Sequence, residues 1–161
     1  MKEKIVCEAI QSLRQEGLKF SVDTLAERLK ISKKTIYKFF PNKETLAFAL
    51  YETFYTKASN CIQKWNSSGQ HPSYTELLQL YFNSYTITRS EIFNKFQLNN
   101  TIYSYAAEKH ATLWNTIFSF FEDFTAEETI TLKVIIDGAF EMACRLRIEP
   151  EHIIKRLVKL L

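Results

Sequence analysis

Apolar residues recur along this chain at steps of three and four, the spacing that places side chains on one face of an α-helix. In the first such segment Ile5, Ala9 and Leu13 lie four residues apart, with Val6 and Ile10 beside them. The chain has only three glycines and three prolines, so residues that break helices are scarce. The pattern predicts an all-α protein of about nine helices.

Helix boundaries are clearest near the start of the chain. We expect a first helix over residues 2–16 and a second over 22–29, with Ser21 as its N-cap. A short connection leads to Ser32, which we expect to cap a third helix over 33–39. Gly17 stands where a cap glycine ends a helix.

Proline and capping signals place the later boundaries. Pro41 ends the third helix, and Asn42 caps a fourth that runs to about Trp65, before a loop over 66–72. Two capping boxes and a proline at a helix start mark three more helices, and weaker boundaries separate the others. These signals are Ser73-x-x-Glu76, Thr125-x-x-Glu128, Pro150, and the weaker boundaries at 89–90 and 98–100.

Charge is unevenly distributed along the chain. Residues 1–50 hold ten Lys or Arg and six Asp or Glu, a balance of +4, whereas residues 51–161 hold eleven and twelve, a balance of −1. From Arg28 to Lys43 there are six basic residues and no acidic one. A basic N-terminal segment on a near-neutral body favours a polyanionic partner for that segment.

The third predicted helix concentrates this charge on one face. At about 100° per residue, Ile36, Phe39 and Phe40 fall on one side and Lys34 and Lys38 on the other. Two helices joined by a tight connection form a helix-turn-helix, whose second helix enters the major groove of DNA. A basic amphipathic helix is equally compatible with a solvated surface, so periodicity alone leaves both interpretations open.

The string TLAERLKISKKTIYKFFPNKETL, residues 24–46, is more specific. It resembles the DNA-binding signature of the tetracycline-repressor (TetR) family of bacterial transcription regulators. The resemblance covers about residues 1–60, and beyond that only the all-helical layout agrees. The matching positions are Ala26 in the second helix, Thr35, Ile36 and Tyr37 in the recognition helix, and Phe40, Lys43, Glu44 and Leu46 after it.

The resemblance implies a set of DNA contacts at the major groove and its phosphates: Lys33, Lys34, Thr35, Tyr37, Lys38 and Lys43. For Lys33 a purely solvated role stays open. Phe39 lies at a position that touches DNA in some relatives, but its projection favours the core. The family usually has glycine at the turn where this chain has Lys30, and a residue at such a turn tends to adopt positive φ.

The resemblance also implies two domains. Residues 1–60 are the DNA-binding domain, with its helix-turn-helix at about 22–39, and residues 61–161 are a helical effector-binding and dimerisation domain. The residues expected to line a pocket for a small apolar effector are Tyr81, Tyr85, Phe96, Tyr103, Trp114 and Phe118. Those expected at the interface of a homodimer, on the last two helices, are Val134, Ala139, Met142, Ile154, Leu157 and Leu161.

Other classes of function lack their signatures. No nucleophile elbow, glycine-rich phosphate loop, HExxH or paired-cysteine motif occurs, so we expect neither an enzyme nor a metal or other cofactor. No apolar run suits a membrane span or a signal peptide, and three scattered cysteines, expected as small buried side chains, suit a reducing cytoplasm.

We therefore expect a ligand-responsive regulator, a repressor in preference to an activator, that binds a palindromic operator in double-stranded DNA as a dimer. In the alternative, the aromatic residues of the second domain are plain core, and a protein partner controls a ligand-free regulator.

Overall fold

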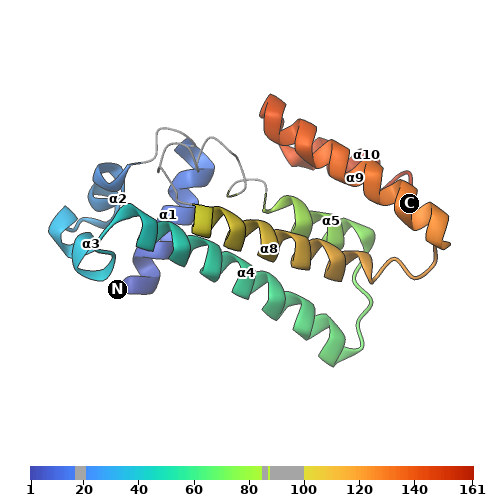
Figure 1. Cartoon of the computed structure of the whole chain (residues 1–161), viewed down its shortest axis with the longest axis horizontal. Coiled ribbons are helices and arrows are strands. Elements are labelled where there is room, and N and C mark those ends of the chain that lie inside the picture. Colours follow the sequence, from blue (N-terminus) through green and yellow to red (C-terminus); the bar gives the residue numbers. More distant parts are fainter. Residues whose placement is uncertain (17–20, 85–86, 88–99) are drawn as a thin grey trace. The chain divides into compact units, whose positions relative to one another are not determined.

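The computed structural model describes residues 1–16, 21–84, 87 and 100–161. Within them it contains eight helices and no strand (Figure 1), which confirms the all-α prediction of about nine helices. The helices are α1 (Lys2–Glu16), α2 (Val22–Leu29), α3 (Lys33–Phe39), α4 (Lys43–Ser68), α5 (Tyr74–Phe82), α8 (Asn100–Phe118), α9 (Ala126–Leu146) and α10 (Pro150–Leu157). Three predicted features fall wholly or partly outside the described residues. They are Gly17, the boundary at 89–90 and the first two residues of the boundary at 98–100.

The chain divides into two compact units. Unit 1 comprises Met1–Thr56 and Thr86–Glu108, and unit 2 comprises Lys57–Tyr85 and Lys109–Leu161. Helices α4 and α8 therefore contribute residues to both units. The predicted functional division at residue 60 stays a prediction, since the compact units group the first part of α8 with the N-terminal helices.

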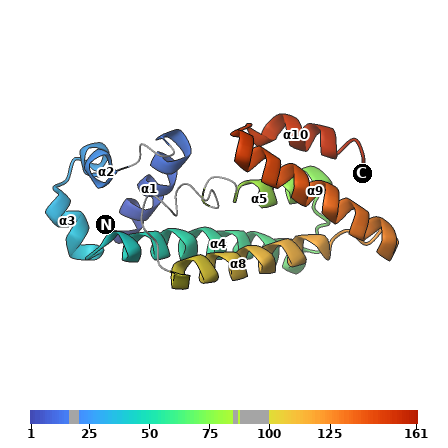
Figure 2. The ribbon, with the colours of Figure 1, turned by 45° about the horizontal axis from the view of Figure 1, so that its top comes forward.

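Unit 1 is built where the apolar stripes of four helices meet. α1, α2 and α3 lie beside the first turns of α4 (Figure 2), and side chains from all four form one buried cluster. The cluster contains Ile5, Val6, Ala9, Leu13, Val22, Leu25, Ala26, Ile36, Phe40, Leu46, Ala49 and Leu50. The four-residue spacing in α1 thus faces the core, as the sequence predicts.

Two small polar side chains of α1, those of Cys7 and Ser12, have unusual exposure. Cys7, expected to be buried, is exposed, because it lies roughly opposite Ile5 and Ala9 on the helix. Ser12 is fully buried within the apolar stripe, and its hydroxyl has no hydrogen-bond partner among the residues that the structure describes. A buried hydroxyl without a partner has lost its water and gained nothing in exchange.

Replacing Ser12 by alanine is therefore expected to raise the free energy of unfolding by roughly 1 kcal/mol. Alanine removes the unpaired hydroxyl, fits the same space and has the better helix propensity. Urea denaturation followed by circular dichroism measures the change. Ser67→Ala, in an exposed part of α4, is the matched control and should shift stability much less. A Ser12→Ala variant less stable than the parent would show that the hydroxyl has a partner in solution.

Unit 2 packs α10 against α5 and α9. Both predicted capping boxes are present: the Ser73 and Thr125 hydroxyls accept hydrogen bonds from the Glu76 and Glu128 amides, and the two glutamates reach back. Pro150 opens α10 as predicted. α4 ends at Ser68, so the first residues of the predicted loop are helical. No helix in the described ranges is both long and apolar enough to span a bilayer.

The apolar stripe of α10 is mostly used within its own chain. Side chains assigned to a dimer interface are expected to be exposed in a single chain, but Ile154 and Leu157 are each only 6% exposed. Because α10 packs against α5 and α9, these two side chains fill the core of unit 2. Leu161 is half-buried and Leu160 is exposed. Ile154 and Leu157 therefore serve the core of their own chain, and their assignment to a dimer interface stays a prediction.

Candidate nucleic-acid interface

Serine hydroxyls begin both helices of the α2–α3 pair. Ser21 Oγ accepts a hydrogen bond from the Thr24 amide at 3.1 Å, and Ser32 Oγ accepts one from the Thr35 amide at 3.1 Å. Both predicted N-caps are thereby confirmed. Each cap satisfies one of the free N–H groups in the first turn of its helix, which sets where α2 and α3 begin.

The turn between α2 and α3 has Lys30 in the left-handed region, at φ 52° and ψ 43°. The Lys30 amide donates to the Glu27 carbonyl and the Ile31 amide donates to the Ala26 carbonyl, each at 3.0 Å. This pair of bonds is a Schellman motif, which glycine usually closes. Ile31 packs against the buried cluster of unit 1. The sequence left open whether Lys30 adopts positive φ, and the structure shows that it does. The motif fixes the direction in which α3 leaves α2.

Lys30→Gly is expected to stabilise the fold by a few tenths to about 1 kcal/mol. Positive φ causes steric strain for lysine but not for glycine, although glycine also loses more backbone conformational entropy on folding. Thermal melts measure the effect. Arg147, the cap of α9, has φ 57° and offers the matched substitution in unit 2. A melting temperature that falls for Lys30→Gly but rises for Arg147→Gly would contradict the strain argument at Lys30.

α3 has one buried side and one exposed side. Ile36 and Phe40 are 1% and 2% exposed, whereas Lys34 and Lys38 point to solvent. Tyr37 is also exposed. The two lysines and the tyrosine hydroxyl thus form a polar outer face on a helix anchored by apolar side chains.

Two residues of α3 depart from the predicted arrangement. Phe39, expected in the core, is 38% exposed, because the short helix packs along the line of Ile36 and Phe40 and leaves Phe39 on its flank. Thr35 is half-buried, and its hydroxyl lies 2.9 Å from that of Ser32. The Thr35 hydroxyl therefore bonds to the cap residue and keeps further hydrogen-bonding capacity, so its contact with DNA stays a prediction.

The start of α4 adds another cation. Lys43 is exposed at the first position of this helix. Asn42 Oδ1 accepts a hydrogen bond from the Thr45 amide at 2.8 Å, which confirms Asn42 as the cap. A lysine beside the free N–H groups of a helix start suits a phosphate.

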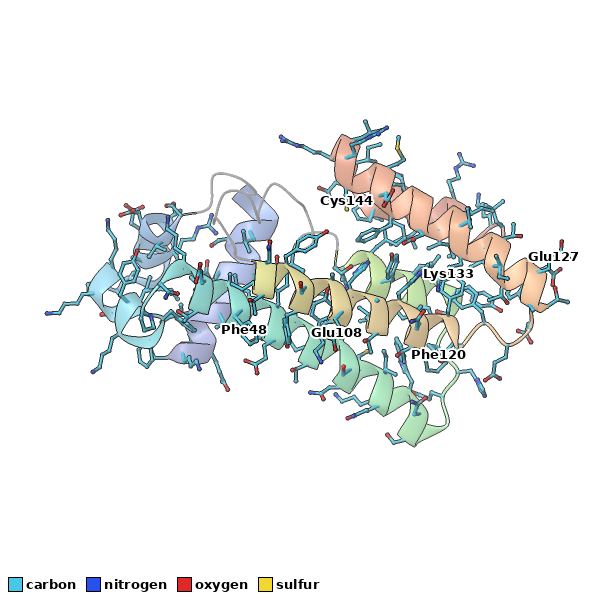
Figure 3. All side chains as sticks on the ribbon, viewed as in Figure 1. Phe48, Glu108, Phe120, Glu127, Lys133 and Cys144 are labelled. Carbon is cyan, nitrogen blue, oxygen red and sulfur yellow. The ribbon has the colours of Figure 1, made fainter. Side chains whose placement is uncertain are left out.

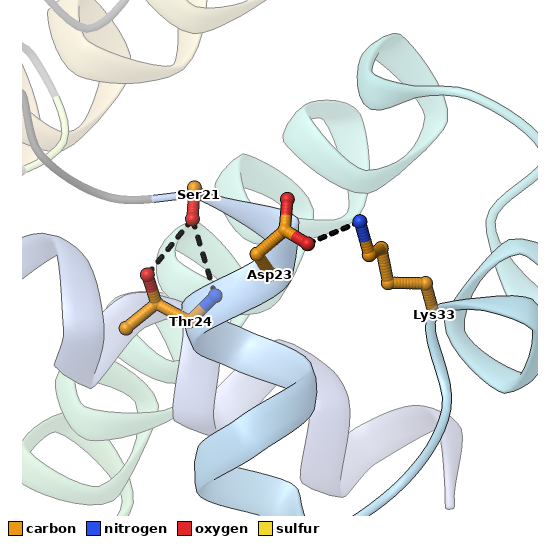
Figure 4. A network of polar contacts seen from close by, with 4 residues as sticks. All are labelled: Ser21, Asp23, Thr24 and Lys33. Atoms are coloured by element: carbon orange, nitrogen blue, oxygen red, sulfur yellow. Dashed lines mark hydrogen bonds and ion pairs between the residues drawn. The ribbon is translucent and has the colours of Figure 1, made fainter.

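Lys33 is tied to a residue that sequence reasoning missed. Its ammonium forms an ion pair with the Asp23 carboxylate of α2 (Figure 4), and this hydrogen bond and charge raise the pKa of Lys33. No charge pattern within one helix signals this pair, because it depends on the angle between α2 and α3. Lys2 was also missed, and its ammonium lies 5.8 Å from the centre of the Phe40 ring. Unit 1 therefore carries an outer face with Lys34, Tyr37 and Lys38 available, and Lys33 paired.

The predicted effector residues are only partly brought together. In unit 2 the Tyr81 ring stacks on Trp114 at 4.0 Å between centroids, and Trp114 contacts Phe118. Tyr103 belongs to unit 1 and is 59% exposed, so it does not line this cluster. Tyr85 and Phe96 lie outside the described residues.

A polar group lies within this aromatic cluster. The Tyr81 hydroxyl donates to Asp137 at 2.8 Å and lies 3.2 Å from His110 Nε2. Burial lowers the pKa of His110, and the nearby Asp137 charge opposes that effect. Trp114 Nε1 is buried and has no acceptor in the described part of the chain. The cluster is thus a packed aromatic core with one hydrogen-bond donor unsatisfied.

Unit 2 also has a surface groove of about 520 Å³. It is lined by His71, Pro72, Ser73, Tyr74, Thr75, Phe120, Glu122, Asp123 and Val158, none of which was predicted for the effector pocket. Phe120, labelled in Figure 3, contacts Trp65 of α4 edge-on. The Tyr74 hydroxyl donates to Asp123 at 3.3 Å.

α9 also has an exposed apolar stripe, a set of side chains outside its buried row. Leu132, Ile136 and Phe140 face the core, while Val134 is 67% and Met142 42% exposed. Ile130, Ile135 and Leu146 extend this stripe, and Ala139 at its edge is half-buried. Lys133 turns inward, where its ammonium donates to Asn115 Oδ1 at 3.1 Å (Figure 3).

Comparison with known proteins bears on the α1–α4 region. Residues 5–50 match the family described as "Bacterial regulatory proteins, tetR family". The chain is also 33% identical over 54 residues to an uncharacterized HTH-type transcriptional regulator, YvaF, of Bacillus subtilis (strain 168). That match spans 34% of the chain and 28% of the relative.

A solved structure resembles the whole fold. A transcriptional regulator of the TetR/AcrR family from Thermobifida fusca YX-ER1 superposes with a TM-score of 0.58 at 17% sequence identity. The superposition covers 99% of this chain and 94% of that one. At this identity the likeness concerns the fold. Together with the match over residues 5–50, it confirms the predicted resemblance.

Proposed function

We propose that this chain, a member of the tetR family of bacterial regulatory proteins over its residues 5–50, regulates transcription by binding double-stranded DNA. The observation that carries the proposal is the outer face of α3. Lys34, Tyr37 and Lys38 are exposed on a helix that Ile36 anchors to the core. Lysines neutralise phosphates, and hydroxyl groups bond to phosphates or base edges.

The proposed complex contains a homodimer on a palindromic operator. A two-fold protein presents two α3 helices, which suit half-sites about one helical turn apart or somewhat more. The exposed stripe of α9 supports this assembly, because it places several large apolar side chains on one helix in contact with solvent. Each chain of the dimer contributes one DNA-binding head, formed by α1–α3 and the start of α4. Lys43 of each head would hold a phosphate, and Lys34 would lie nearer the bases.

Selection from a random pool of duplex DNA tests this proposal and identifies the operator at the same time. The full chain should enrich an inverted repeat, and the preference should change for Lys34→Ala. Lys43→Ala should bind all sequences more weakly without changing the preference. Retention of duplexes with no shared sequence after several rounds would contradict specific regulation.

We further propose that a small apolar effector acts on unit 2 and that the protein represses transcription in the cytoplasm until the effector binds. The unsatisfied Trp114 donor among aromatic side chains supports this site. An effector shifts the DNA-binding equilibrium only by its differential affinity for the two states, typically about 1–3 kcal/mol.

The tight Tyr81–Trp114 stack favours the alternative, a ligand-free regulator controlled by a protein partner. Thermal shift with a library of apolar compounds separates the two. Stabilisation that is lost in Trp114→Phe supports the effector. An unchanged melting temperature across the library, with capture of a partner protein, supports the alternative.

A further inference from the structure

The Asp23–Lys33 ion pair joins the first turns of the two helices of the proposed DNA-binding motif. Asp23 is the second residue of α2 and Lys33 is the first residue of α3. Their side chains are 61% and 55% exposed, so the pair lies at the surface. Figure 4 shows the contact as a dashed line from Asp23 to Lys33. The Ser21 cap and its bond to Thr24 hold the turn that carries Asp23.

The carboxylate of Asp23 occupies the place on Lys33 that a DNA phosphate would take. Both groups are oxygen anions that attract the same ammonium. Lys33 therefore gains less from a phosphate than a lysine on a fully solvated face would gain. An exposed ion pair is weak, so DNA can break it, but the break offsets part of the phosphate contact.

A helix-dipole role alone does not explain the pair. An acid in the first turn of α2 interacts favourably with the helix N-terminus. That interaction, however, needs no partner on α3. Glu27, the other acid of α2, is exposed and has no ion pair within the described part of the chain. Asp23 thus differs from Glu27 in its contact with a cation of α3.

We propose that Asp23 restrains sequence-independent binding of duplex DNA by holding Lys33 in an ion pair that a phosphate must replace. The inference rests on the proposed function. A lysine on a flexible stem reaches a phosphate on any sequence, so a free Lys33 would add affinity without adding discrimination. Asp23 is in this sense a specificity-determining residue that acts through Lys33.

The test uses the full chain and a fluorescently labelled random-sequence duplex of about 30 base pairs, titrated at several salt concentrations. The variants are Asp23→Asn, Glu27→Gln, Lys33→Met and the double variant Asp23→Asn with Lys33→Met. Glu27→Gln removes the same charge from the same helix and is the matched control. Methionine keeps the apolar stem of Lys33 while removing its charge.

Asp23→Asn is expected to bind random DNA about two- to fivefold more tightly per head than Glu27→Gln. Its slope of log K against log salt should steepen by about 0.9 per head, because Lys33 gains a phosphate. In the Lys33→Met background both effects should vanish.

Equal effects of Asp23→Asn and Glu27→Gln would overturn the inference, since bulk charge would then suffice. Persistence of the Asp23→Asn effect without Lys33 would also overturn it, because Asp23 would then act by direct repulsion. In both cases salt-dependent binding by the parent chain would leave the proposed function standing. Absence of such binding in the parent chain and in every variant would overturn the proposed function and this inference together.

Discussion

Replacing Lys34 and Lys38 by alanine is expected to weaken binding of duplex DNA by roughly 10²–10³-fold at about 0.15 M salt. Each phosphate contact contributes a slope of about −0.9 to log K against log salt, which is roughly a factor of five between 1 M and 0.15 M. The change removes two such lysines from each head of a dimer. Both side chains are exposed on α3, so the free energy of unfolding should change little.

Fluorescence anisotropy with a labelled duplex measures this loss, and circular dichroism confirms that the variant folds. Lys57→Ala with Lys64→Ala, two exposed lysines of α4 in unit 2, is the matched control for net charge. The control should lose little affinity. Equal losses in the two double variants would mean that overall charge, and not the α3 face, attracts DNA.

Val134→Glu combined with Met142→Glu is expected to raise the dissociation constant of the homodimer by at least 10²-fold. Both side chains lie on the exposed stripe of α9. Pairing of two chains through this stripe would bury the new carboxylates without partners, which costs several kcal/mol. Because the parent side chains are exposed in one chain, the variant should still fold, but as a monomer.

Sedimentation equilibrium at micromolar concentration measures the mass, and Gln63→Glu on an exposed part of α4 is the control. DNA affinity should fall with the dimer, since one head makes half of the contacts. A variant at position 157 is a poor test, because Leu157 is buried in unit 2 and a charge there would disrupt the core. A dimer that survives the two α9 changes would place the interface elsewhere.

Local signals made the α1–α4 region predictable. Ser21, Ser32 and Asn42 each cap a helix through a bond to a residue three positions away, so the neighbours that decide the boundary are visible in the sequence. The left-handed conformation of Lys30 was left open, because the glycine that usually closes a Schellman motif is replaced here by lysine.

Features that depend on distant neighbours were harder to predict. Helical projection gives the direction of Phe39 and Leu157 but not which surface covers them. For that reason the expected burial of Phe39 and exposure of Leu157 were wrong. By contrast, Val134 was assigned to the dimer interface on α9, and the structure leaves its side chain exposed. The ion pair of Asp23 with Lys33 needs the angle between α2 and α3, which no pattern of charges within one helix contains.

The central claim, that the α2–α3 pair binds DNA through phosphates and base edges, is tested most directly by a salt titration of the parent chain with a duplex selected from the random pool. Two heads making together about 6–10 phosphate contacts should give a slope of log K against log salt of about −5 to −9. A slope near zero, or no binding to duplex DNA at about 50 mM salt, would contradict the claim.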